Sequence, residues 1–193
     1  MAPAPEAQLA WFSAALQELP AFLGSSDVFR PLHPPPSGMA QDLSLGGLLL
    51  VSDSLSVRAA SFDPLRRGEC EKALRQWESL HADRAAAVGA KATAEIPHRL
   101  NLWLAYLQDL AEKPAAASDY SIEVRHRVLL DRLGEMASAT LEGKRAMALE
   151  AADRDLRSHL RGEAFVWDAP LAGAYPRQRF WYLYGRPVAA ARV

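Results

Sequence analysis

A segment near the middle of the chain constrains the fold more than any other feature. The residues Arg99–Leu110 read RLNLWLAYLQDL, and their apolar side chains cover almost the whole circumference of a helix. Asn101, Gln108 and, one turn later, Glu112 form a narrow polar stripe. A helix with this distribution is normally enclosed by neighbours on most sides. The segment therefore predicts an all-α protein whose other helices pack around it.

Further segments carry apolar residues at spacings of three and four, the period of an amphipathic helix. They cover Pro5–Leu19, Leu65–Val88, Ser118 or Ser121 to Met136, and Leu141–Leu160. Another segment, Leu45–Ala59, is interpreted as a helix. The alternative interpretation is a buried strand at Leu48–Val51, because Gly46-Gly47 disfavours a helix and the apolar run also suits a strand.

Proline and glycine residues separate these segments. The helix capped at Asp63 is expected to end at Gly89, and Pro97 is expected to open the next one. Residues 27–39, which include Pro34-Pro35-Pro36, are expected to form a stiff extended connection.

The chain has 193 residues, a length that suits one domain. We expect an all-α, single-domain bundle of about five or six helices. An N-terminal helix and a Pro-rich connection are expected in residues 1–40, and the helical core in residues 41–162. Residues 163–193 are expected to form an irregular, aromatic-rich C-terminal tail that packs on the core.

Composition excludes several classes of protein. The single cysteine, Cys70, cannot form an internal disulfide, and the first residues lack the cationic start and apolar run of an export signal. No stretch is long and apolar enough to cross a bilayer. The net charge of −1 gives no general attraction to nucleic acid. We therefore expect a cytoplasmic protein that binds neither membrane nor nucleic acid.

Three glutamates each stand three residues ahead of a histidine, as neighbours on one helix surface. The pairs are Glu78 and His81, Glu95 and His98, and Glu123 and His126. The first and third pairs have the histidine within an apolar stripe and the glutamate at its edge. Glu95 lies opposite the leucines of its helix, so its pair is excluded from any core site.

Two such pairs, with a carboxylate from each of two further helices, are the ligand pattern of ferritin-like di-metal bundles. The chain resembles this pattern in two fragments and differs from it in ligand count and helix order. The hypothesis is an iron or manganese site with oxidoreductase activity, built from Glu78, His81, Glu123 and His126 with Glu142 or Asp153 from the last helix. The favoured interpretation is that His81 and His126 are neutral core residues bonded by their neighbours.

No catalytic residue is predicted. The chain has no glycine-flanked serine nucleophile, no phosphate-binding loop and no cysteine or histidine pair for zinc. Cys70 lies in an apolar stripe, as an inert core thiol does.

The final residues mix aromatic and arginine side chains. We expect Phe180, Trp181 and Leu183 to fold back over the helices while tyrosine and arginine tips reach water. Residue types that anchor protein interfaces gather here, and the predicted partner-binding residues are Trp181, Tyr184, Arg177 and Arg179. The predicted function is non-enzymatic: contacts with other proteins, through self-association or an assembly or adaptor role.

Overall fold

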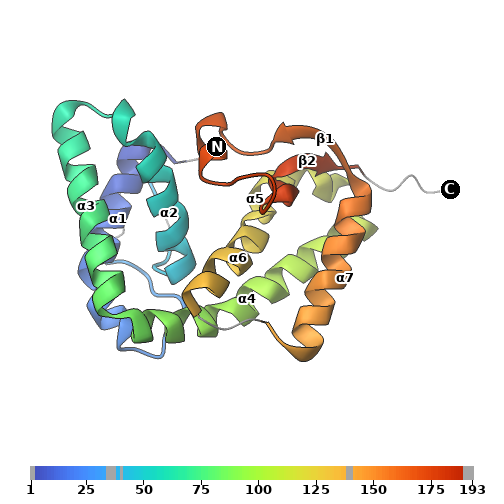
Figure 1. The fold of residues 1–193 in the computed structure, drawn as a ribbon, viewed down its shortest axis with the longest axis horizontal. Coiled ribbons are helices and arrows are strands. Elements are labelled where there is room, and N and C mark those ends of the chain that lie inside the picture. The colour runs from blue at the N-terminus through green and yellow to red at the C-terminus, as the bar shows by residue number, and fades with distance from the viewer. Residues whose placement is uncertain (1–2, 34–37, 40, 138–140, 189–193) are drawn as a thin grey trace. The chain divides into compact units, whose positions relative to one another are not determined.

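A computed structural model describes residues 3–33, 38–39, 41–137 and 141–188 (Figure 1). The chain divides into two compact units. The first unit comprises Met1–Glu95 with Met136–Ser138, and the second comprises Ile96–Glu135 with Ala139–Val193. The prolines at 34–36, which were expected to stiffen a connection, lie outside the described residues. The assignment of all residues to one domain stays a prediction.

Three helices build most of the first unit: α1 (Pro5–Leu23), α2 (Leu45–Arg58) and α3 (Pro64–Asp83). Each of them contacts the other two. Their apolar faces supply a core of fully buried side chains that includes Trp11, Phe12, Leu16, Leu19, Leu48 and Leu55. Asp63 caps α3 as its sequence predicts, since its Oδ1 accepts hydrogen bonds from the amides of Leu65 and Arg66 at 3.0 and 3.1 Å.

The segment that suited either a helix or a strand is helical, and its glycines have a packing role. Ser44 Oγ accepts a hydrogen bond from the Gly47 amide at 3.0 Å, and Glu95 Oε2 accepts one from the Gly46 amide at 3.0 Å. A Cβ on Gly47 would lie 2.5 Å from Gln41 Nε2 and 3.3 Å from the Trp11 ring. Glycine therefore allows the close approach that buries this end of α2, and the buried Glu95 carboxylate satisfies one of its first amides, that of Gly46.

The boundaries expected around α4 (Ala85–Glu112) were wrong. The helix before it, α3, ends at Asp83 rather than at Gly89, and α4 continues through both Gly89 and Pro97. Gly89 serves a close approach, because a Cβ there would lie 3.3 Å from the carbonyl oxygen of Met136. The expectation that α4 is enclosed on most sides is also wrong in part, since Leu102 is 47% exposed.

The second unit combines helices with a small sheet. Its elements after α4 are the short α5 (Tyr120–Glu123), α6 (Arg125–Ala137), α7 (Gly143–His159), β1 (Leu160–Phe165) and β2 (Tyr184–Pro187). Short 3₁₀ helices complete the described chain: η1 (Ala59–Ser61), η2 (Pro114–Asp119), η3 (Ala169–Gly173) and η4 (Trp181–Leu183). Six α-helices in the described residues exceed one turn (α1–α4, α6 and α7), which confirms the predicted all-α class.

The tail is less irregular than expected, because β1 and β2 form an antiparallel pair. Leu160 pairs with Pro187 and Arg161 with Arg186, and the register shifts before Phe165 pairs with Tyr184. Gly185 has φ +119°, and a Cβ there would lie 3.0 Å from the Arg161 carbonyl oxygen. The pair therefore depends on glycine at this position. Across the described residues, no helix combines the length and apolar character that a bilayer crossing requires.

Candidate functional site

A run of aromatic contacts folds the C-terminal tail onto the helices of the second unit. Successive rings meet edge to face, from Trp167 to Tyr175, from Tyr175 to Phe180 and from Phe180 to Tyr182. Their centroids lie 5.2, 5.1 and 6.2 Å apart, within the range of favourable aromatic pairs. The Trp167 indole also donates a hydrogen bond to the carbonyl oxygen of Ser121 at 2.7 Å.

The tail is fixed further by an ionic network around Arg127, which is buried. Its Nη1 donates to Asp131 Oδ1 at 2.6 Å, and its Nε and Nη2 donate to Asp153. The Tyr182 hydroxyl donates to the second oxygen of Asp131 at 2.7 Å. The hydroxyl of Tyr120 donates to the Tyr182 carbonyl oxygen at 2.6 Å. These bonds hold η4 in place and thereby set the position of its first residue, Trp181.

An open surface hollow of about 490 Å³ lies beside Trp181. It is lined by Arg157, Arg177, Gln178 and Trp181, and we call it the arginine–tryptophan hollow. Arg157 comes from α7, whereas the other three residues come from the segment that contains η4. The hollow is thus assembled from two parts of the chain that are separated in sequence.

Arg157 and Trp181 form the organised part of this hollow. The guanidinium carbon of Arg157 lies 4.2 Å from the centroid of the Trp181 ring, a cation–π arrangement. Among the residues that the structure describes, no carboxylate forms an ion pair with Arg157. A guanidinium carries five N–H donors, and a cation–π contact with a ring does not use them as hydrogen bonds to an acceptor oxygen.

Arg177 presents a second guanidinium to the same hollow. Its Nη2 donates to Glu163 Oε1 at 3.0 Å, and both side chains are well exposed. The four lining side chains supply N–H donors and an aromatic face. Arginine, glutamine and tryptophan are not nucleophiles, and none of these three residue types titrates near neutral pH. The chemistry of the hollow is therefore that of binding an anionic or polar group.

The other two predicted partner-binding residues, Arg179 and Tyr184, form polar contacts within the chain. Arg179 pairs with Glu135, and its guanidinium lies 5.0 Å from the Phe180 ring centroid. The Tyr184 hydroxyl donates to the carbonyl oxygen of Tyr175 at 2.9 Å. The structure thus brings Trp181 and Arg177 together with Arg157, which was not among the predicted partner-binding residues. Partner binding by these residues stays a prediction.

The expectation that Phe180, Trp181 and Leu183 fold back over the helices is confirmed for two of the three residues. Phe180 and Leu183 are buried, whereas Trp181 is half-exposed. Tyr182 differs from the expectation that tyrosine tips reach water, because it is fully buried with its hydroxyl bonded inside the protein. The reason is the half-buried carboxylate of Asp131, which accepts the hydrogen bond from this hydroxyl.

The residues of the metal hypothesis are distributed over both units. Glu78 and His81 belong to the first unit, where the His81 ring stacks on Trp77 with a centroid distance of 5.6 Å. Glu123 and His126 belong to the second unit, with Glu123 Oε2 3.5 Å from His126 Nε2. The hypothesis therefore concerns residues of two units and stays a prediction.

The two further carboxylates have different surroundings. Asp153 accepts three hydrogen bonds from Arg127, whereas Glu142 is exposed immediately before α7 and makes no capping bond. In the described parts of the chain, no group of three or more His, Cys, Asp and Glu residues is arranged to hold a metal ion.

His126 is a neutral, buried histidine. Burial, with the nearby cations Arg99 and Arg125, lowers its pKa to about 3. Its Nδ1 is buried without a hydrogen-bond partner among the described residues. The favoured interpretation of a neutral core histidine agrees with this burial and pKa.

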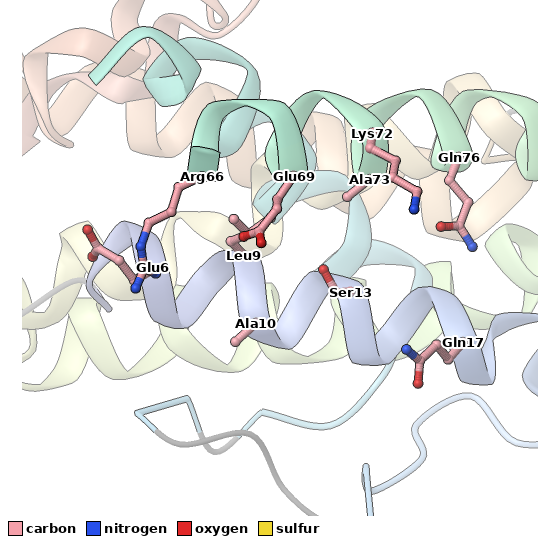
Figure 2. Close-up of a pocket in the computed structure, with 10 residues that line it drawn as sticks. All are labelled: Glu6, Leu9, Ala10, Ser13, Gln17, Arg66, Glu69, Lys72, Ala73 and Gln76. Carbon is pink, nitrogen blue, oxygen red and sulfur yellow. The ribbon is translucent and has the colours of Figure 1, made fainter. Parts of the chain in front are cut away.

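A second hollow, of about 340 Å³, lies between α1 and α3 of the first unit (Figure 2). Figure 2 shows Glu6 and Arg66 at one end and Gln17 and Gln76 at the other. Two acidic and two basic residues line this groove, so its charges favour neither sign of ligand. Its full lining is Glu6, Leu9, Ala10, Ser13, Gln17, Arg66, Glu69, Lys72, Ala73 and Gln76.

Comparisons with protein-family models, with curated proteins and with solved structures find no match to this chain.

Proposed function

We propose that this protein is a non-enzymatic, cytoplasmic interaction protein that contacts a partner protein through the arginine–tryptophan hollow. The observation that supports this most directly is the stacked pair of Arg157 and Trp181, whose guanidinium has no carboxylate partner in the described chain. Tryptophan and arginine are the residue types that most often dominate the binding energy of protein interfaces.

The construction of the hollow also supports a binding role. The buried Arg127 network and the aromatic run hold the segment that carries Trp181, so its position is set before a partner arrives. A side chain that is already ordered loses less conformational entropy on binding. Trp181 is therefore better suited to anchor a contact than a tryptophan on a loose tail.

Site-specific cross-linking tests this proposal. Gln178, which lines the hollow, is replaced by the photoreactive amino acid benzoylphenylalanine in the protein's native cells. The control carries the same amino acid at Gln108, an exposed glutamine of α4. We expect discrete adducts heavier than the 21.1 kDa chain from position 178 and not from position 108.

Mass spectrometry then identifies what is cross-linked. An adduct of two identical chains indicates self-association, and one with another protein indicates an assembly or adaptor role. The adduct should disappear when Arg157→Ala or Trp181→Ala is added, because each removes half of the stacked pair. The absence of adducts, or the same adducts from both positions, would contradict the proposed function.

A further inference from the structure

The two cations of the arginine–tryptophan hollow differ in how their charge is balanced. Arg157 stacks on Trp181 and pairs with no carboxylate of the described residues, whereas Arg177 pairs with Glu163 at 3.0 Å. The Arg177 guanidinium holds the pKa of Glu163 below its usual range, so this carboxylate is ionised at neutral pH. Within the described residues, one cation of the hollow therefore already binds a carboxylate and the other does not.

The charge of the surrounding chain has the same sign. From Tyr120 to Val193 there are 12 basic and 9 acidic residues, so the net charge is 12 − 9 = +3. A positive net charge attracts acidic partners during encounter and disfavours basic ones. This net charge and Arg157, which pairs with no carboxylate in the described part of the chain, both point to an acidic ligand.

We propose that the hollow binds an acidic segment of a partner protein, with one carboxylate on Arg157 and a second replacing Glu163 on Arg177. The proposal rests on the proposed function and names the chemistry of its partner. Guanidinium groups bind carboxylates through two parallel hydrogen bonds, which suits both arginines. The half-exposed Trp181 ring offers apolar surface to the stem of the bound side chain.

Glu163 is well placed to be replaced. Its side chain is 77% exposed, and ion pairs with this exposure are weak. It lies in the part of β1 between Arg161 and Phe165 where the pairing with β2 is irregular. Glu163 can therefore move away from Arg177 without disturbing a regular pair of the sheet. In the free protein it acts as a built-in competitor for the hollow.

Fluorescence anisotropy with labelled probes tests this inference. The acidic probe is an octapeptide rich in glutamate, and its control has glutamine at every glutamate position. A labelled octathymidylate serves as the competing class of anion. We expect only the acidic peptide to bind tightly, and its affinity to fall with added salt. Arg157→Gln and Trp181→Leu should each weaken that binding by about tenfold.

The effect of Glu163→Gln has the opposite sign and is the decisive measurement. Removing the competitor should strengthen binding of the acidic peptide by about two- to fivefold. The matched control is Glu135→Gln, which breaks the exposed pair with Arg179 and changes the net charge equally, but does not alter the lining of the hollow. It should leave the affinity close to that of the unchanged protein. Circular dichroism confirms that each variant is folded.

The alternative outcomes separate the two proposals. Equal effects of Glu163→Gln and Glu135→Gln would overturn the replacement of Glu163. Failure of the acidic peptide to bind, or tighter binding of octathymidylate, would overturn the acidic segment as the ligand. Neither result removes the proposed function, which depends on the cross-linking at Gln178. If that cross-linking fails while the peptide binds, the proposed function is wrong and the anion site remains.

Discussion

Arg127 of α6 and Asp153 of α7 form a largely buried ion pair with bidentate hydrogen bonding. The Nε of Arg127 lies 2.9 Å from Oδ1 and its Nη2 lies 2.8 Å from Oδ2, so both carboxylate oxygens are bonded. The same guanidinium lies 4.7 Å from the centroid of the Tyr182 ring and bonds Asp131. The pair thus joins two helices and also supports the segment that presents Trp181.

We expect Arg127→Ala to destabilise the protein by about 3–5 kcal/mol, because it leaves the Asp153 carboxylate without its cation in a largely buried place. Urea unfolding followed by circular dichroism measures this loss. The control is Arg75→Ala, which removes an exposed ion pair with Glu71 and should cost less than about 1 kcal/mol. Equal losses of unfolding free energy in the two variants would show that the Arg127–Asp153 pair stabilises the protein no more than an exposed ion pair does.

The buried His126 should make the free energy of unfolding depend on pH. Its pKa is about 3 in the folded protein and 6.5 in the absence of the fold, so only the unfolded chain takes up a proton between these values. Its contribution to stability is therefore complete above pH 6.5 and falls as the pH drops toward 3. The expected slope is at most about 1.4 kcal/mol per pH unit.

This prediction is checked by urea unfolding between pH 7.5 and 4.5, with His126→Gln as the reference that cannot titrate. Arg99 and Arg125 oppose protonation of His126, whereas the Glu123 carboxylate lies beside it at 3.5 Å. The difference between the free energies of unfolding of the two proteins isolates the contribution of His126 from that of the carboxylates, which titrate in both. If both lose stability in parallel from pH 6.5 downward, His126 is not responsible.

Gly185 and Gly173 provide a matched test of the sheet pairing. At Gly185, φ is +119° and a Cβ would lie 3.0 and 3.1 Å from the carbonyl oxygens of Arg161 and Gly162. At Gly173, nothing lies within 4 Å of an added Cβ. We expect Gly185→Ala to cost about 1–3 kcal/mol and Gly173→Ala to be nearly neutral, measured as shifts in thermal unfolding. Similar melting temperatures would contradict this account of the hairpin.

The metal hypothesis has its own measurement. We expect the purified protein to contain no stoichiometric iron or manganese, and its melting temperature to be unchanged when either metal is added. The reason is that Arg127 already occupies Asp153, and the described residues hold no group of three suitable ligands. Stoichiometric metal that disappears in a folded His81→Ala, His126→Ala variant would support the hypothesis instead.

Much of the helical pattern was predictable because it depends on neighbours in sequence. The cap at Asp63 and the helices that contain Leu16, Leu55 and Leu129 follow from local spacing and capping preferences. The helix end predicted at Gly89 was wrong because it too was inferred from local sequence alone. Spacing alone does not show that Met136 packs against that glycine.

The candidate site was predictable only in part. Composition indicated Trp181 and Arg177, since both residue types are common in interfaces. It did not indicate Arg157, because its partner ring is distant in sequence and no local pattern joins them. The pairing of β1 with β2 escaped prediction for the same reason, since their strands are separated by η3 and η4.

By itself the sequence determined that this chain is helical, where most helices lie and which residue types gather at its end. These properties follow from backbone geometry and the periodicity of apolar side chains, which act between residues a few positions apart. Only the tertiary structure decided that Arg127 binds Asp153, that Glu95 caps α2 and that Arg157 stacks on Trp181. Such contacts join sequence-distant groups, and they form only where packing brings the groups within bonding distance and removes water from them.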